Sequence, residues 1–169
     1  SASGNVGIGT TSPTSKLNVY GSGSNLSVFK ADGSSGTLFE VTDNLSGSLF
    51  SVNTISGIPV LEVFSDNTIV AGTENRISNG AVRSFIGAGQ CNIISGSGSF
   101  IGAGFNNFID GQHSSILGGS NNRITGDFSL AGGEFSLSTA NQAFAYGYNV
   151  TASAGASTAF GAVNEASGL

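Results

Sequence analysis

The sequence predicts an all-β chain built from short strands and from the stacked coils of a β-solenoid. In the C-terminal half, pairs of apolar residues recur every fourteen to sixteen residues. A polar motif, Asn-x-Ile-x-Gly, recurs between these pairs, and units of strand and turn precede both. Two strands and two turns in about fifteen residues make one coil of a solenoid.

The composition fits a folded chain with many tight turns. Only 9% of the 169 residues are charged, against about 25% in ordinary domains, and there are 27 Gly but only 2 Pro. The 38% apolar content, with 12 Phe, argues against disorder. A net charge of −5 without a run of Lys or Arg predicts no nucleic-acid partner. No apolar stretch reaches the length of a membrane span, so we expect no membrane insertion in this segment.

Residues 1–21 predict a fibre connector with a Ser-Pro turn, made of two short strands or of a strand and a turn. The chain begins at Ser1 and contains no Met, which predicts a processed or excised piece. The solenoid pattern runs to Leu169 without a cap, so we expect further sequence after it.

Residues 22–72 predict a β shaft of strand units separated by Asp, Asn or Gly turns. Phe29, Phe39, Phe50 and Leu61 recur at spacings of 10, 11 and 11 residues. Apolar residues fall on both faces of each strand, and a short meander cannot bury both faces by itself. We therefore expect these Phe side chains to meet copies of themselves from other chains.

Residues 73–169 predict the roll of stacked coils. Adjacent strand residues point to opposite faces, so one residue of each apolar pair fills the coil and the other needs a partner outside it. Self-association supplies that partner, and the sequence leaves open which residue faces inward. The candidate core and interface residues are Phe85, Ile86, Phe100, Ile101, Ile116, Leu117, Leu130 and Phe144.

The polar motif predicts a hydrogen-bonded asparagine ladder. Equivalent residues of successive coils stack at roughly 4.8 Å, so Asn92, Asn107 and Asn122 should bond through their side-chain amides. The glycines that end the motif, at 96, 111 and 126, are expected in a turn of positive φ. Cys91 is the only cysteine and is interpreted as a small core residue.

Two stretches resemble known trimeric fibres. "NQAFAYGYNVTASAGASTAFGAVNEASG" (141–168) is similar to the head repeats of YadA-type trimeric autotransporter adhesins, and "GNVGIGTTSPTSKLNVYG" (4–21) resembles shafts of bacteriophage tail fibres and mosaic adhesive trimers. The resemblance implies a left-handed parallel β-roll and a homotrimer. It also implies an extracellular, cell-surface or virion fibre that reaches a surface receptor, glycan or protein. Ile and Leu replace the usual Ala of these heads at 85–118, which predicts a wider roll there.

The sequence offers weak candidates for catalysis or metal binding. Asp110 and Asp127 are the best pair of carboxylates for glycan hydrolysis, but both occupy turn positions. His113, beside a single carboxylate, is expected to face solvent in a turn. We therefore expect neither an enzyme nor a bound cofactor or metal.

A glycan-binding module is the alternative to a purely structural fibre. Turn aromatics next to the repeated strand can stack on sugar rings, although packing between chains would explain them too. The candidates for such contacts are Phe105, Phe128, Phe135, Tyr146 and Tyr148.

Overall fold

The computed structural model describes residues 4–23, 26–43, 47–78 and 80–168, and within these ranges every regular element is a strand and none is a helix. The chain divides into two compact units, Ser1–Ser65 and Asp66–Leu169. The all-β prediction is therefore confirmed. Residues 66–72, which the sequence pattern groups with the shaft, belong to the second unit.

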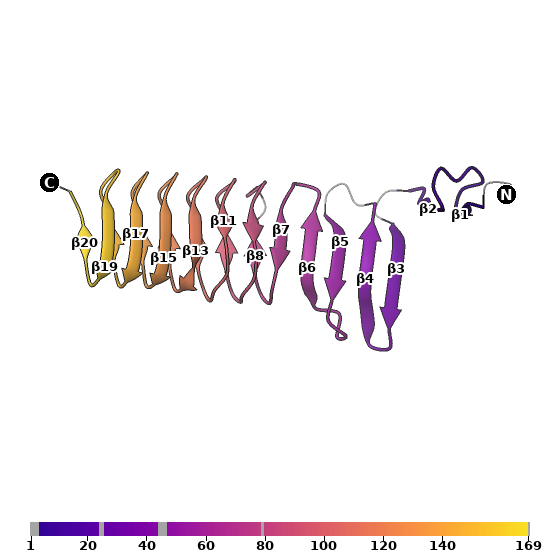
Figure 1. The fold of residues 1–169 in the computed structure, drawn as a ribbon, viewed down its shortest axis with the longest axis horizontal. Coiled ribbons are helices and arrows are strands. Elements are labelled where there is room, and N and C mark those ends of the chain that lie inside the picture. The colour runs from indigo at the N-terminus through magenta and orange to yellow at the C-terminus, as the bar shows by residue number, and fades with distance from the viewer. Residues whose placement is uncertain (1–3, 24–25, 44–46, 79, 169) are drawn as a thin grey trace. The chain divides into compact units, whose positions relative to one another are not determined.

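The first unit contains a two-stranded sheet and four strands of a larger sheet. The predicted pair of short strands is present, because β1 (Val6–Ile8) and β2 (Leu17–Val19) pair in parallel. An antiparallel meander follows (Figure 1), in which each strand pairs with the next. Its strands are β3 (Ser27–Gly33), β4 (Gly36–Thr42), β5 (Ser48–Asn53) and β6 (Pro59–Phe64).

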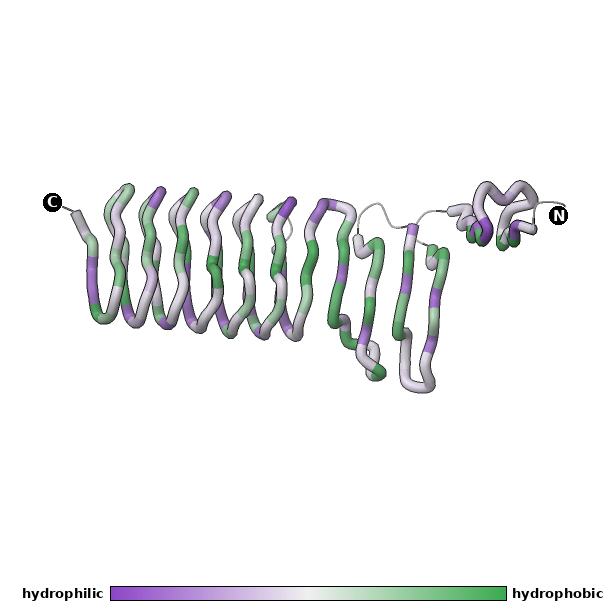
Figure 2. The backbone as a smooth tube through the Cα atoms, in the orientation of Figure 1, coloured by the Kyte–Doolittle hydropathy of each residue, from purple (hydrophilic) through white to green (hydrophobic). Residues whose placement is uncertain are grey.

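One face of this meander is apolar throughout. Residues directly opposite one another in antiparallel strands share a face. The rings of Phe29, Phe39 and Phe50 meet edge to face within one chain, with centroids 5.6 and 5.2 Å apart. Figure 2 shows hydrophobic stretches on all four strands, yet no residue of this face is buried. The face consists of Phe29, Ala31, Phe39, Val41, Phe50, Val52, Leu61 and Val63.

Bulges explain why apolar residues adjoin one another in these strands. The pairing register shifts at four places, and each shift leaves one residue unpaired, directly before a repeated Phe or Leu. The unpaired residues are Val28, Leu38, Leu49 and Val60. The bulges therefore account for the extra apolar residue next to each repeated Phe or Leu.

The second unit is a β-solenoid in which two strands alternate around each coil (Figure 1). Every strand pairs in parallel with the equivalent strand of the neighbouring coil. The first sheet contains β7 (Ile69–Ala71), β9 (Phe85–Ile86), β11 (Phe100–Ile101), β13 (Ser115–Ser120), β15 (Leu130–Glu134), β17 (Phe144–Tyr148) and β19 (Thr158–Ala162). The second contains β8 (Arg76–Ile77), β10 (Ile93–Ile94), β12 (Phe108–Ile109), β14 (Arg123–Ile124), β16 (Leu137–Ser138), β18 (Thr151–Ala152) and β20 (Glu165–Ala166).

The register settles which residue of each apolar pair faces inward. Ile86 and Ile101 are fully buried, whereas Phe85 and Phe100 are each 37% exposed. The expected register is wrong by one residue at the third pair, because Ile116 stacks on Ile101 and Ser115 stacks on Phe100. Leu117 is therefore no core residue, and its side chain is exposed.

The coil interior changes from Ile to Ala along the chain. Ile pairs fill the coils from Ile86 to Ile124, and a second cluster of Ala143, Ala145, Val150, Ala152 and Ala159 follows. The change coincides with a register shift between Ile116 and Gly119, where the coil shortens from 15 to 14 residues. Larger side chains thus accompany the longer coils, in agreement with the wider roll predicted for 85–118.

The asparagine ladder is confirmed and extends one coil further than predicted. Asn92, Asn107 and Asn122 are almost completely buried. Asn107 donates from Nδ2 to Oδ1 of Asn92 at 2.9 Å, and Asn122 donates in the same way to Asn107 at 3.0 Å. Asn75, seventeen residues before Asn92, supplies the first rung. The irregular spacing hides this rung in the sequence.

A serine ladder lies immediately before the inward strands of the first sheet. Ser84, Ser99, Ser114 and Ser129 are buried, and each of the last three donates its backbone N–H to the hydroxyl of the serine one coil before. Each hydroxyl also donates to a backbone carbonyl, as Ser114 does to Gly126 at 3.0 Å. Serine at a period of fifteen, just before each apolar pair, is the signal that sequence reasoning missed.

Two corners of each coil hold residues in the left-handed backbone conformation, most of them not glycine. One column precedes the asparagine ladder, with φ from 49° to 58°: Glu74, Cys91, Asn106, Asn121, Phe135, Asn149 and Val163. The other precedes the serine ladder and includes Arg83, His113, Phe128, Gln142 and Ala156. The expectation of positive φ at the motif glycines is wrong. Gly111 is required instead by close stacking, since a Cβ there would lie 1.9 Å from the carbonyl oxygen of Gly126.

Replacing Asn107 by Leu should destabilise the solenoid by about 3 kcal/mol, because the buried backbone N–H of Asn122 loses its acceptor. Chemical denaturation measures this loss. The exposed Gln112→Ala change is the control and should stay within about 0.5 kcal/mol. Equal stability of the two variants would show that the ladder contributes nothing.

The two coil interiors should respond oppositely to side-chain size. Ile109→Ala opens a cavity and should cost about 2–5 kcal/mol, whereas Ala145→Ile overfills an interior lined by Ala and should cost about 1–3 kcal/mol. Thermal melting, with the exposed Ser153→Ala change as control, compares them. A tolerated Ala145→Ile would contradict the narrow interior.

Candidate functional site

The outward column of the first sheet forms an apolar stripe along the solenoid. Phe85 and Phe100 stack with their planes 8° apart and their centroids at 5.8 Å. Further along, Tyr146 stacks on Phe160 at 5.9 Å, and Phe144 leans on Tyr146. Ser115 interrupts the column after Phe100, and Leu130 follows it and stacks on Phe144; Leu130 and Phe144 are both half-buried. The stripe therefore offers aromatic area that one chain alone leaves in water.

The predicted contact aromatics all project outward, but they occupy different columns. Tyr146 belongs to the stripe, whereas Phe135 and Tyr148 meet edge to face at 6.4 Å beside the asparagine corner. Phe128 stacks on His113 at the serine corner, with centroids 5.1 Å apart. Phe105 pairs with Ser120 of the next coil and stacks on no other ring among the described residues. Of the five predicted aromatics, the structure brings only Phe135 and Tyr148 together, so they do not form one site.

A groove lies where the asparagine corner meets the outward column of the second sheet. Its volume is about 310 Å³. The Arg123 guanidinium lies over the Phe108 ring, 4.6 Å from its centroid. Asn106 donates from Nδ2 to Oδ1 of Asn121 at 2.8 Å, which forms a second, outer amide pair. The lining residues are Cys91, Ile93, Asn106, Asn107, Phe108, Asn121, Asn122 and Arg123.

Cys91 lies at the surface of this corner and not in the core, so its prediction as a core residue is wrong. Its thiol donates to Oε2 of Glu74 at 3.1 Å, and Nε2 of Gln90 donates to the same oxygen at 3.0 Å. These hydrogen bonds, the one from Cys91 first, lower the pKa of Glu74. The hydrogen bond to the Glu74 carboxylate raises the pKa of the Cys91 thiol, so the thiol is less nucleophilic than a free cysteine at neutral pH.

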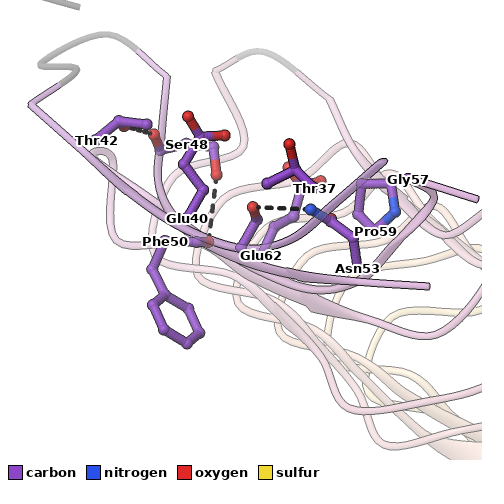
Figure 3. A pocket seen from close by; sticks show the side chains of 10 residues that line it. Thr37, Glu40, Thr42, Ser48, Phe50, Asn53, Gly57, Pro59 and Glu62 are labelled. Carbon is purple, nitrogen blue, oxygen red and sulfur yellow. Dashed lines mark hydrogen bonds between the residues drawn. The ribbon is translucent and has the colours of Figure 1, made fainter. Parts of the chain in front are cut away.

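A polar pocket of about 350 Å³ lies on the meander (Figure 3). Glu40 and Glu62 flank Ser51 in register and line it together with Asn53. Burial raises the pKa of Glu62, and a hydrogen bond from Ser48 opposes this rise. The Asn53 Oδ1 atom is buried and accepts no hydrogen bond from the described residues.

The residues considered for catalysis or metal binding, Asp110, Asp127 and His113, lie at positions that the stacked coils explain. Asp127 stacks on Gln112, whose backbone N–H donates to its Oδ1 at 2.8 Å, whereas Asp110 stacks on Thr125. The two carboxylates therefore do not occupy equivalent positions in successive coils. His113 is exposed, as expected of a turn histidine. The described part of the chain contains no group of three or more His, Cys, Asp or Glu arranged to hold a metal ion.

Comparison with protein-family models, with curated proteins and with solved structures gives no match to this chain. Within the described ranges, no helix has the length and apolarity needed to span a membrane. The columns of outward side chains, the groove and the pocket are therefore the candidate functional features.

Replacing Glu74 by Gln should speed alkylation of Cys91 several-fold at pH 8. Loss of the carboxylate removes the cause of the raised thiol pKa and so increases the thiolate fraction. Mass spectrometry after timed exposure to iodoacetamide measures the rate. Glu165→Gln removes a carboxylate elsewhere in the solenoid and should leave the rate unchanged, while equal acceleration in both variants would indicate a general charge effect.

Proposed function

We propose that this chain is a segment of a homotrimeric attachment fibre, wound as a left-handed β-roll and displayed outside the cell or on a virion. The observation that carries the proposal is the apolar stripe of the first sheet, which lies directly outside a filled coil interior. Soluble monomers rarely expose apolar patches larger than a few hundred Å². Packing the stripe against two further copies would remove it from water.

The meander supports the same proposal independently. Its apolar face has no buried residue within the chain, although strands with such a face need a packing partner for stability. Phe29, Phe39 and Phe50 form an edge-to-face series on that face. Copies of this series around a threefold axis would bury it, as the sequence repeat predicts.

The solenoid also has the properties that a fibre needs. Buried ladders of Asn and Ser satisfy polar groups at both corners of the coil, and hydrogen bonds join each coil to the next along the unit. A single unpaired carboxylate or a lost rung is costly in such a stack. The low charge, 9% of residues, leaves a surface of small polar residues and aromatic pairs to meet a target.

Light scattering of the purified chain tests the assembly, with three times the mass of one chain as the expected result. A stable monomer would refute the proposal. The resemblance of 141–168 to adhesin heads sets the expected number of copies, because the stripe alone calls for association without fixing its order.

Substitution by Asp at Phe100 and Ile101 should give different kinds of failure. Ile101→Asp places an unpaired carboxylate in the coil interior and should unfold its coil, at a cost of several kcal/mol. The side chain at position 100 faces outward, so Phe100→Asp should leave the chain folded. It should give assemblies of lower mass, because three carboxylates would meet at the interface. Light scattering with thermal melting separates the two outcomes.

The control for this pair is Gln112→Asp, which is exposed and should shift stability by less than about 0.5 kcal/mol. A Phe100→Asp variant with the mass and melting temperature of this control would remove the argument for an interface on the stripe.

A glycan-binding module is the second candidate, favoured by aromatic side chains that lie off the stripe. Phe128 is 63% exposed and Tyr148 is 52% exposed, each beside a second aromatic ring. Glycan-array binding that disappears in Phe128→Ala or Tyr148→Ala, while the assembly keeps its mass, would establish this role. Binding unaffected by both changes would exclude these rings as the contact.

A further inference from the structure

The groove of the second sheet carries polar groups that the fold itself does not use. Among the described residues, the only ion pair joins Lys30 to Asp32, so the Arg123 guanidinium has no carboxylate within 4.0 Å. Phe108 holds this guanidinium on its ring face, which limits its motion without neutralising its charge. Arg123 therefore presents an oriented fork of donors to the groove.

The outer amides complete the pattern. The Asn106–Asn121 hydrogen bond uses Nδ2 of one amide and Oδ1 of the other. No described residue bonds Oδ1 of Asn106 or Nδ2 of Asn121, so one acceptor and one donor stay open, one coil apart. Coils repeat at roughly 4.8 Å, a span that suits hydroxyls on alternate carbons of one sugar ring.

We propose that this groove binds a saccharide that carries a carboxylate, with Arg123 on the carboxylate and the amides of Asn106 and Asn121 on the ring hydroxyls. The volume of about 310 Å³ accommodates one monosaccharide unit. Phe108 is a positioning residue here, because the guanidinium covers the ring face on which a sugar would otherwise stack.

The surroundings favour an acidic sugar over a small free anion. The chain has a net charge of −5, and the ionised Glu74 lies at the same corner, beside Cys91. A small anion would contact only Arg123, while the negative charge of the chain repels it. An acidic saccharide would also form hydrogen bonds with the two amides. A neutral sugar would leave the unpaired guanidinium without an acceptor.

This assignment deepens the proposed attachment function by naming a receptor class, and it uses the second sheet, away from the stripe proposed for assembly. It requires only the stacked coils. A monomer that binds the sugar would refute the trimer and retain the groove, and a trimer that does not bind would do the reverse.

The test is an NMR titration that follows the side-chain amide signals of the ¹⁵N-labelled chain. Sodium glucuronate, glucose and sodium acetate are added separately at equal concentrations. We expect saturable shifts of the Asn106 and Asn121 amides with glucuronate and several-fold weaker responses to the other two. Equal responses to acetate would indicate a simple anion site, equal responses to glucose would exclude the role of Arg123, and no response would remove the site; each result overturns the proposal.

Two variants with a matched control sharpen the test. Arg123→Gln should weaken glucuronate binding about tenfold, whereas Arg76→Gln removes the same charge from the same column outside the groove and should not. Asn106→Gly keeps the left-handed backbone and removes one amide, so glucuronate binding should weaken while acetate binding stays the same. Equal effects of Arg76→Gln and Arg123→Gln would reduce the site to general electrostatics.

Discussion

The hydrogen bond from each coil to the next is the interaction on which the solenoid depends. Backbone N–H groups donate to carbonyls of the following coil, as Ile93 does to Asn107 at 2.8 Å and Phe108 does to Asn122 at 2.9 Å. Such bonds place equivalent residues directly over one another, so each inward position must accept its own copy above and below. Asn and Ser satisfy this condition, because each of these side chains both donates and accepts.

The same constraint governs how the coil narrows. A coil that loses a residue must shift its register at one place, and its interior must shrink as well. The register shift lies inside β13, between Ile116 and Gly119, and the interior narrows where Ala131 stacks on Ile116. The ladder adapts as well: Ser136 follows Asn122 and donates its N–H to Oδ1 of that residue at 2.9 Å. The shorter side chain suits the shorter coil.

Sequence reasoning found the features that repeat and missed those that depend on one coil. Period and residue type were enough for the ladder of Asn92, Asn107 and Asn122 and for the strands. The predicted register was wrong by one residue at Ile116, because Ile116 and Leu117 are adjacent apolar residues and resemble the earlier pairs. The serine at a period of fifteen, two residues before each inward residue, would have given the correct register. The Arg123–Phe108 contact and the Cys91–Glu74 hydrogen bond join different residue types in different coils. A repeated sequence pattern therefore does not predict them. The bulges of the meander were hidden likewise, since only pairing reveals an extra residue.

The outward columns divide the possible functions between the two sheets. The outward column of the first sheet is mostly apolar, although Ser115 interrupts it between Phe100 and Leu130, and it suits contact with another apolar surface. The outward column of the second sheet changes at every coil, from Arg76 through Phe108 and Arg123 to Glu165. Backbone stacking does not require that variety. Outward side chains, unlike inward ones, need not fit against their own copies in the coils above and below. A surface that differs from coil to coil distinguishes one position along the solenoid from the next, which recognition of a single ligand requires and symmetric assembly does not.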